Sequence, residues 1–295
     1  MAKLSHRLEY AAVFFFAAIA NLLSARTADS LGRTLGSLFH YFWGSRKKVA
    51  FENIQKSDIA QNYSKLETEA LVKRVFQKTG RTLIEVSRLR QLGQNGASKI
   101  VELGSLQHLI KAREEGHGCI VLTAHFGNWE LLGGMATTLG FKIHFLVASQ
   151  HNLLVNDFLI KQRKEMGVGI ISLERSAREV FKVLKANEIV AIVADQHAPS
   201  GIKLNFLGRE ALAARGPALF SIRRKAPVCP YLIRRERFDR HIVIAGPMIY
   251  PPDSGNEEAD IRYITEKYTN FFADGIRQWP DQWLWTHRRW KIPEN

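Results

Sequence analysis

The chain has 295 residues, of which 24% are charged, and its formal net charge is +14 at pH 7. This length fits one α/β domain with an N-terminal extension. The basic balance implies a negatively charged partner, which could be nucleic acid, an anionic lipid surface, an acidic protein or a phosphorylated substrate. The two cysteines, Cys119 and Cys229, have neither CxxC nor Cys/His metal spacing, so we expect reduced core thiols and neither a disulfide nor a metal site.

An uncharged, strongly apolar segment runs from Tyr10 to Ala25. Its 16 residues fall short of the roughly 20 that cross a bilayer upright, so the segment could span a thinned bilayer or lie shallow in it. A secretory signal peptide is the alternative, because two basic residues precede the segment and Ala18-Ile-Ala20 resembles a cleavage site. Since Leu22-Leu23 continues the apolar run past that site, we predict a retained membrane anchor.

A second apolar face with helical spacing follows the anchor. Its members are Leu31, Leu35, Leu38, Phe39 and Phe42. The cluster Arg46-Lys47-Lys48 comes next, where each cation at an anionic leaflet could contribute about 1 kcal/mol. The alternative is a core helix with a solvated charge run behind it. We therefore expect membrane-anchoring or interfacial helices in residues 1–45 and an α/β domain in residues 46–295.

Helices and strands alternate through the rest of the chain. Apolar periodicity and glycine stops predict helices over residues 66–92, 105–115 and 176–187 and a final helix after the loop at 251–256. Short apolar runs predict strands at 119–124, 143–148, 189–194, 228–233 and 242–245. This alternation indicates a mixed, mostly parallel sheet flanked by helices, in which sites gather at the carboxyl ends of the strands. His125 and Asp195 each follow such an end.

The segment from His125 to Glu130 carries the clearest chemical signal. On a continuous helix an offset of five residues would turn the two side chains roughly 140° apart, so the pair can meet only if the chain turns back. Gly127-Asn128 breaks the strand, and Asn128 is a good N-cap for a helix from Trp129 to about Leu139. This places Glu130 in the first helical turn, facing His125.

Such a pair suits the activation of a hydroxyl group. A neutral imidazole can take the proton from an acceptor alcohol, while the carboxylate fixes the tautomer and stabilises the imidazolium. The plainer alternative is a structural histidine beside a glutamate that favours a helix start. Asp195 could orient a substrate hydroxyl or form an ion pair with a basic neighbour.

Two further segments contain basic residues that could bind a ligand. Arg215-Gly216-Pro217 begins a predicted helix, where it could bind an anion or only shape the turn. The C-terminal segment from Trp283 to Trp290 alternates aromatic and basic residues. It could be a membrane-interface belt, a nucleic-acid stacking surface or a packed terminal strap.

Four segments together resemble a known family. Thr123-Ala-His125-Phe-Gly-Asn-Trp-Glu130 resembles the H-x4-[DE] signature of the bacterial lipid A biosynthesis acyltransferases, the late lauroyl and myristoyl transferases, which have mycobacterial relatives acting on phosphoinositol mannosides. The other matching segments, in the family's order, are Arg163-x-x-x-Gly167, Ala194-Asp195-Gln196 with Phe206-Leu-Gly208, and Trp283-Leu-Trp-Thr-His287-Arg288-Arg289-Trp290-Lys291. The resemblance spans about residues 120 to 291.

The resemblance implies direct transfer of a fatty acyl chain from a thioester to a hydroxyl of a lipid A precursor or related glycolipid. The donor would be acyl carrier protein for most members and acyl-coenzyme A for some, with no cofactor or metal. The catalytic domain would face the cytoplasm at the inner membrane. His125 would be the general base and Glu130 its support, while Arg163 and backbone donors at Gly127 and Asn128 would bind a phosphate or the oxyanion.

The resemblance also bears on the remaining candidates. It favours a structural or headgroup-binding role for His287, Arg288 and Arg289 over a nucleic-acid surface. A solvated arginine is the alternative reading of Arg163. Where the family usually has a second acid two residues after the aspartate, this chain has His197, which puts a carboxylate role there in doubt and could mark a different acceptor.

Two other classes of protein stay as alternatives. The first is a basic, membrane-associated lipid-binding protein that has this fold but no catalysis. A nucleic-acid binder is less favoured, because the chain has no zinc-finger or RRM signature and its basic residues are not confined to one tract. A hydrolase with an acyl-enzyme is disfavoured by the lack of a G-x-S-x-G elbow or a cysteine nucleophile with an evident triad.

Overall fold

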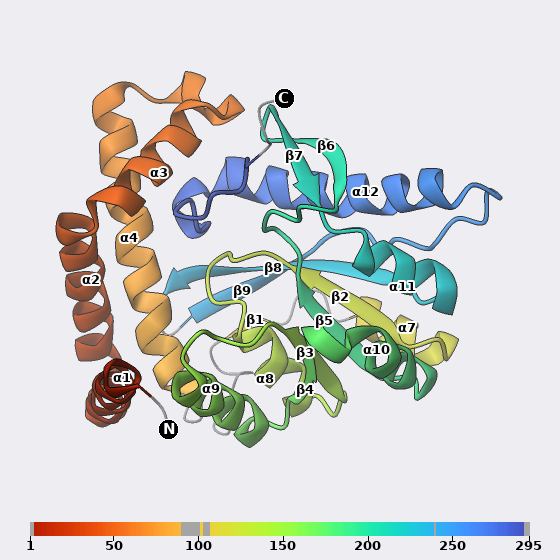
Figure 1. Cartoon of the computed structure of the whole chain (residues 1–295), viewed down its shortest axis with the longest axis horizontal. Helices are drawn as coiled ribbons and strands as arrows, with labels where there is room; N and C mark the ends of the chain where they lie inside the picture. The colour runs from red at the N-terminus through yellow and green to blue at the C-terminus, as the bar shows by residue number, and fades with distance from the viewer. Residues whose placement is uncertain (1–2, 90–100, 103–106, 239, 292–295) are drawn as a thin grey trace.

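A seven-stranded sheet forms the centre of the protein (Figure 1). The computed structural model describes residues 3–89, 101–102, 107–238 and 240–291. Within these residues the strand order is β1-β9-β8-β2-β5-β3-β4, and all neighbours are parallel except β8 and β9. The strands are β1 (Val101–Glu102), β2 (Cys119–Thr123), β3 (Ile143–Val147), β4 (Gly169–Ser172), β5 (Ile189–Val193), β8 (Val228–Arg237) and β9 (Arg240–Ala245). The predicted α/β class with a mixed, mostly parallel sheet is confirmed.

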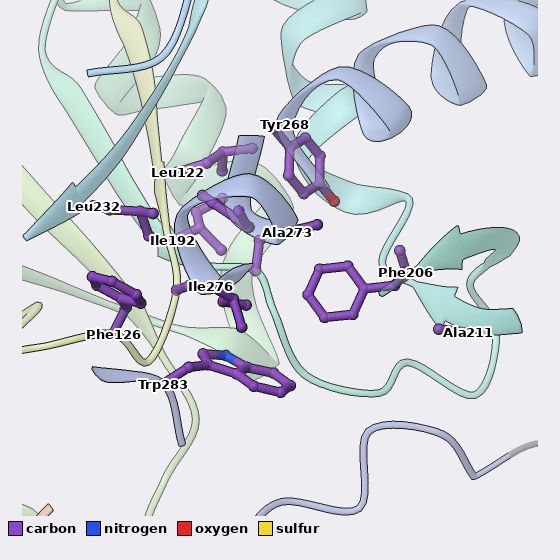
Figure 2. Close-up of a cluster of buried hydrophobic side chains, with 14 of the residues drawn as sticks. Leu122, Phe126, Ile192, Phe206, Ala211, Leu232, Tyr268, Ala273, Ile276 and Trp283 are labelled. Carbon is purple, nitrogen blue, oxygen red and sulfur yellow. The ribbon is translucent and has the colours of Figure 1, made fainter. Parts of the chain in front are cut away.

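Helices cover both faces of this sheet, which is why its strands are continuous apolar runs. All five residues of β2 are buried. Ile120 and Leu122 face a core shared with α10 (Ser176–Lys185), α11 (Gly216–Arg224) and α12 (Glu257–Gln278), part of which is drawn in Figure 2. Cys119 and Val121 face the other core, with α7 (Gln107–Glu115) and α8 (Leu131–Thr138). Alternate side chains of one strand therefore serve two separate cores.

The N-terminal third of the chain is helical and lies at one end of the sheet (Figure 1). It comprises α1 (Leu4–Leu22), α2 (Ala25–Phe42), α3 (Gly44–Gln55) and α4 (Lys65–Ser87), with a 3-10 turn at Asp58–Asn62. Helix α2 packs closely along α4: a Cβ atom on Gly32 would lie only 2.7 Å from the Cα atom of Arg81. Asp29 of α2 also pairs with Arg81, Oδ1 to Nε, at 2.5 Å. The N-terminal helices are thus tied to the remainder of the chain.

The predicted anchor segment forms most of α1. Within the described residues, none of the helices combines the length and apolarity that crossing a bilayer requires. Helix α1 is held at its start by Asn152, whose side-chain amide donates to Glu9 Oε2 at 2.8 Å and to the backbone oxygen of His6 at 2.9 Å. The apolar side chains of Phe15 and Leu22 are exposed.

The predicted second apolar face divides between the core and the surface. Leu31 and Leu35 of α2 pack against a small core that contains Ile84. Leu38 and Phe42, on later turns of the same helix, are exposed. The core-helix alternative therefore holds for Leu31 and Leu35, and for Phe39, which packs against the main core, whereas Leu38 and Phe42 leave an apolar surface open.

The structure adds β1, β4 and a hairpin to the strands that the sequence predicts. An antiparallel hairpin of β6 (Ile202–Phe206) and β7 (Arg209–Ala213) turns through Leu207 and Gly208, which both have positive φ. Helix α4 runs unbroken through Gly80, whose missing side chain makes room for the backbone of α2. The predicted end of this helix at residue 92 lies outside the described residues.

Candidate active site

The two residues predicted at strand ends lie next to each other. Strands β2 and β5 are parallel neighbours, with Thr123 opposite Val193. The ladder continues one step further, because the Ala194 backbone N–H donates to the Thr123 oxygen at 2.8 Å. His125 and Asp195 follow at the same carboxyl edge of the sheet, where sites gather in folds of this class.

Asp195 holds the imidazole of His125. One carboxylate oxygen, Oδ1, lies 2.7 Å from His125 Nδ1. The other, Oδ2, accepts the His125 backbone N–H at 2.9 Å and the indole N–H of Trp283 at 2.7 Å. The Asp195 side chain is 2% exposed and that of His125 is 20% exposed. The ring is therefore fixed through Nδ1, and Nε2 is approached by Gln196 Nε2 at 3.4 Å.

The two groups shift each other's protonation. Burial would lower the pKa of His125, but the charge and hydrogen bond of Asp195, with a smaller effect of Glu130, outweigh it and raise that pKa above its usual value. Burial would likewise raise the pKa of Asp195, but the His125 imidazole and the hydrogen bonds to the carboxylate lower it. Asp195 is thus an ionised carboxylate whose two oxygens are both engaged.

Glu130 does not contact the imidazole, contrary to the sequence prediction. Its carboxylate instead binds Arg163 of α9 (Leu153–Glu165): Arg163 Nε donates to Oε2 at 2.9 Å, and Nη2 donates to Oε1 at 2.6 Å. Burial would lower the pKa of Arg163, but the hydrogen bond and charge of Glu130 raise it. This two-point ion pair neutralises the arginine that was expected to face the reacting groups.

The turn after His125 depends on a glycine. Gly127 has φ +58°, and a Cβ atom there would collide with the backbone oxygen of Ile233 in β8. Its backbone N–H donates to the Gln282 oxygen at 2.9 Å, and its own oxygen accepts from Thr82 Oγ1 at 2.8 Å. The predicted role of the Gly127 N–H as a free oxyanion donor is therefore wrong, because the N–H is already paired.

Asn128 is not the helix cap that the sequence predicts. Its side-chain amide donates to Glu85 Oε2 at 2.8 Å, and α8 begins only at Leu131. Arg235 completes this fully buried cluster: its Nε donates to Glu85 Oε1 at 2.7 Å, and its Nη2 donates to Oε2 at 2.6 Å. A buried carboxylate needs partners of this kind, and here they connect α4, β8 and the loop after His125.

The sequence prediction missed Glu85 and Arg235. Burial would raise the pKa of Glu85, but Arg235 and then His241 lower it to about 2. The only available signal was a glutamate inside the apolar stripe of a predicted helix, between Leu83 and Val86. An isolated charge in such a stripe indicates a paired buried group, yet it does not reveal the partner.

The C-terminal segment is a packed strap, as one of the three alternatives proposed. Phe126 and Trp283 form an antiparallel bridge, and the Leu284 backbone N–H donates to the His125 oxygen at 3.1 Å. Trp283 also packs edge to face with Phe206, with ring centroids 5.7 Å apart (Figure 2). The Trp285 indole donates to the Pro280 oxygen at 2.7 Å. These rings are used in packing, which leaves none of them as an open stacking surface.

The predicted basic residues separate into three environments. Arg215 pairs with Glu258 of α12, Nη1 to Oε2 at 2.8 Å, so a carboxylate occupies the expected anion position. Arg289 is fully buried over the face of Phe206 and donates to the Leu212 oxygen. His287 and Arg288 line a cavity of about 600 Å³. Among the described residues, no group of three or more His, Cys, Asp or Glu side chains is arranged to hold a metal ion.

Comparisons with known proteins identify the family of the chain. Residues 2–292 match the family model of the bacterial lipid A biosynthesis acyltransferases. The phosphatidylinositol mannoside acyltransferase of Mycolicibacterium smegmatis is 23% identical over 221 residues, covering 70% of this chain and 67% of the relative. The lipid A biosynthesis palmitoleoyltransferase of Escherichia coli is 23% identical over 267 residues, covering 88% of this chain and 84% of the relative. The chain therefore belongs to the bacterial lipid A biosynthesis acyltransferase family and is an acyltransferase.

Proposed function

We propose that the protein moves a fatty acyl chain from an acyl thioester to a hydroxyl of a glycolipid, with His125 as the general base. The observation that carries this proposal is the 2.7 Å contact between His125 Nδ1 and Asp195 Oδ1. Because the carboxylate accepts the Nδ1 proton, the lone pair lies on Nε2. Within the part of the chain that the structure describes, the hydrogen-bonding group near Nε2 is Gln196 Nε2, at 3.4 Å. This tautomer is the one that a base needs.

The reaction then runs without a covalent enzyme intermediate. His125 Nε2 takes the proton of the acceptor hydroxyl while the oxygen attacks the thioester carbonyl carbon. The tetrahedral intermediate collapses as the carbon–sulfur bond breaks, and the imidazolium returns its proton to the thiolate that leaves. Asp195 stays ionised throughout and stabilises the imidazolium, as the carboxylate of a hydrolase triad does.

Arg163 and Glu130 keep a supporting role in this proposal. Glu130 engages Nε and Nη2 of Arg163, which leaves Nη1 without a partner among the described residues. That nitrogen is the part of the guanidinium available to a developing oxyanion. Glu130 therefore acts through Arg163 and through its charge, which contributes to the raised pKa of His125.

The names of the relatives support the class of acceptor. One relative is named for phosphatidylinositol mannoside and another for lipid A, and both acceptors are glycolipids. We propose that this chain likewise acylates a lipid A precursor or a related glycolipid. Its net charge of +14 suits a negatively charged donor, either acyl carrier protein or the phosphates of acyl-coenzyme A.

A surface of exposed aromatic and basic residues supports work at a membrane. Tyr41, Phe42 and Trp43 are exposed where α2 ends and α3 begins, and Arg46, Lys47 and Lys48 follow in α3. Aromatic rings favour the headgroup level of a bilayer, and cations are attracted to anionic lipids. We propose that the protein lies on the cytoplasmic face of the inner membrane and is held there by this surface and α1.

The test compares two histidines that each pair with a carboxylate. His144 Nε2 lies 2.7 Å from Glu188 Oε2, a pair that matches His125 and Asp195 but lies at the opposite, amino end of β3 and β5. His125→Ala should slow acyl transfer from a radiolabelled thioester about a thousandfold, whereas His144→Ala should keep most of the rate. Transfer that survives His125→Ala would refute the catalytic assignment. A wild-type protein that binds glycolipid but transfers no acyl group would favour the inactive lipid-binding alternative.

A further inference from the structure

A cavity of about 600 Å³ is lined by basic side chains from three parts of the chain. Arg46 comes from α3, His197 follows β5 by four residues, and His287, Arg288 and Lys291 come from the C-terminal strap. Figure 1 shows α3 beside this end of the chain, and Asn53 of α3 donates to the His287 backbone oxygen at 2.8 Å. The cavity is therefore a built feature of the fold.

The positive charge of this cavity is not neutralised by the protein. No Asp or Glu is among its described lining residues. Arg46, Arg288 and Lys291 form no ion pair with any carboxylate that the structure describes. Some surface cations elsewhere are paired, as Lys203 is with Glu210 at 3.0 Å. Three unpaired cations around one hollow indicate a site for an anion from outside the chain.

Fixed hydrogen-bond donors accompany the charge. Arg46 is oriented by its own contacts: Nη1 donates to the Thr286 oxygen at 3.1 Å, and its guanidinium lies 6.0 Å from the centre of the Trp43 ring. The Nδ1 atom of His287 is buried and has no hydrogen-bond partner among the described residues. A guanidinium held in this way presents its remaining donors to a phosphate with little loss of side-chain freedom.

The pKa values of the two histidines that line the cavity depend on nearby charges. Burial lowers the pKa of His197, and the charges of Arg289 and Lys291 lower it further. The pKa of His287 is also lowered, chiefly by burial, and His287 interacts electrostatically with both Asp195 and His125. Two short segments join the cavity to the catalytic pair: His197 follows Asp195 by two residues, and the strap that carries His287 donates the Leu284 backbone N–H to the His125 oxygen at 3.1 Å.

We propose that this cavity binds a phosphate group of a substrate and thereby fixes the reacting end of that substrate against His125. This inference rests on the proposed function, because it assigns the site to a substrate of the acyl transfer. The volume exceeds that of a phosphate ion and admits an attached sugar or pantetheine unit. Two sources share this chemistry: the phosphate of a glycolipid headgroup, and the phosphate of the carrier that bears the thioester. Binding either phosphate would hold the reacting group of that substrate in a fixed position, which favours the reaction.

Calorimetric titration of the full-length protein at low salt tests the proposal with defined probes. The probes are inositol 1-phosphate, phosphopantetheine and inorganic phosphate, with inositol and pantetheine as uncharged controls. The double variant Arg46→Gln/Arg288→Gln removes two of the unpaired cations. Arg74→Gln is the control, because Arg74 is also an exposed arginine, lies on α4 and does not line this cavity. Thermal unfolding of both variants checks that the fold is kept.

We expect wild type and Arg74→Gln to bind one of the organic phosphates at least about tenfold more tightly than Arg46→Gln/Arg288→Gln does. A preference for inositol 1-phosphate assigns the cavity to the acceptor, and a preference for phosphopantetheine assigns it to the donor. Equal affinity in the double variant and Arg74→Gln would overturn the proposal. So would organic phosphates that bind no more tightly than inorganic phosphate or than their uncharged controls.

His125→Ala separates this inference from the proposed function. That variant should bind the preferred organic phosphate as wild type does, although it should lack acyl transfer. If wild type binds the organic phosphate, the double variant does not, and wild type nevertheless transfers no acyl group, the proposed function is wrong and the cavity is an anion-binding site without a role in acyl transfer. If acyl transfer is intact but phosphate binding is the same in all variants, the cavity assignment alone is wrong.

Discussion

Asp195 lies 70 residues after His125 in the sequence but only 2.7 Å from it in space. The nearer acidic residue, Glu130, belongs to a different pair, because its two oxygens are taken by Arg163. The chain thus has two adjacent ion pairs with separate tasks. One holds an imidazole in the tautomer that a base needs, and the other keeps a partly buried guanidinium charged.

Gly127 is a position where the backbone conformation and the surrounding atoms leave no room for a side chain. Gly127→Ala should destabilise the protein by more than about 2 kcal/mol, because it combines positive φ with a collision against the Ile233 backbone oxygen. Gly140→Ala is the matched control, since Gly140 also has positive φ, +76°, but an added Cβ atom would meet open space. Its expected cost is about 1 kcal/mol. Urea denaturation measures both values, and equal costs would show that the close approach to β8 contributes nothing.

At the level of elements, the loop after His125 is held from two sides. Thr82 and Glu85 of α4 bind the Gly127 oxygen and the Asn128 amide, and Gln282 binds the Gly127 N–H from the C-terminal strap. Arg235 of β8 links the two sides, because it pairs with Glu85 while its backbone oxygen accepts from Gln282 Nε2 at 3.1 Å. Helix α4 and the C-terminal strap therefore together set the position of His125.

The charge of Glu85 should appear in the pH dependence of stability. Its pKa falls from 4.5 to about 2 on folding, so its stabilising effect is complete above pH 4.5 and is lost as the pH falls towards about 2. The full effect is about 3 kcal/mol. Glu85→Gln should lower the free energy of unfolding at pH 7 by about 3 kcal/mol or more, because Arg235 then stays buried without a counter-charge.

Denaturant unfolding at pH 3, 5 and 7 measures this effect. The wild type should lose stability between pH 5 and pH 3, and Glu85→Gln should lose less over the same range. Glu69→Gln, an exposed substitution on the same helix, should behave as wild type does. If Glu85→Gln and wild type have parallel pH profiles, Glu85 does not keep its charge in the folded protein.

The sequence predicted where most strands lie along the chain, but it did not predict which strands lie side by side in the sheet. Continuous apolar runs identified β2, β3, β5, β8 and β9, and the placement of His125 and Asp195 at strand ends is confirmed. What the sequence lacked was the strand order: β5 returns to lie beside β2 although β3 and β4 come between them in the chain. That crossover brings Asp195 to the imidazole, and no local spacing encodes it.

Local signals also misled where tertiary contacts compete with them. Asn128 has the preference of a helix cap, but the buried Glu85 carboxylate offers its amide a stronger, charged acceptor. Glycine weakens a helix interior, yet Gly80 is one of the glycines that allow the backbones of α2 and α4 to approach closely. In both cases a partner distant in sequence decides the role of the residue.

For the whole molecule, the exposed apolar side chains gather in the N-terminal helices. Most of the large ones, including Phe14, Phe15, Leu22, Tyr41 and Phe42, lie before residue 45. The three basic residues Arg46, Lys47 and Lys48 follow directly, and Arg46 lines the cavity of about 600 Å³. A membrane-facing end and the reacting centre would then lie close together, which suits a lipid acceptor that keeps its chains in the bilayer.

This arrangement predicts where membrane binding should be lost. The double variant Phe15→Ser/Phe42→Ser removes two exposed apolar side chains and should weaken binding to phosphatidylglycerol vesicles about tenfold. Leu173→Ser is the matched control, because Leu173 is also exposed but lies far along the chain between β4 and α10. Vesicle co-sedimentation measures both. Equal binding by the two variants would place the membrane surface elsewhere.

The central claim is that Asp195 holds and tunes His125 as the base, and the pH dependence of acyl transfer tests it most directly. Asp195 raises the pKa of His125, and only the unprotonated imidazole can act, so kcat/KM of wild type should rise with pH through a value above 6.5. In Asp195→Asn the transition should move to lower pH, and the plateau should fall about a thousandfold. In Glu130→Gln the transition should move less. A transition that stays in place in Asp195→Asn but moves in Glu130→Gln would contradict the assignment.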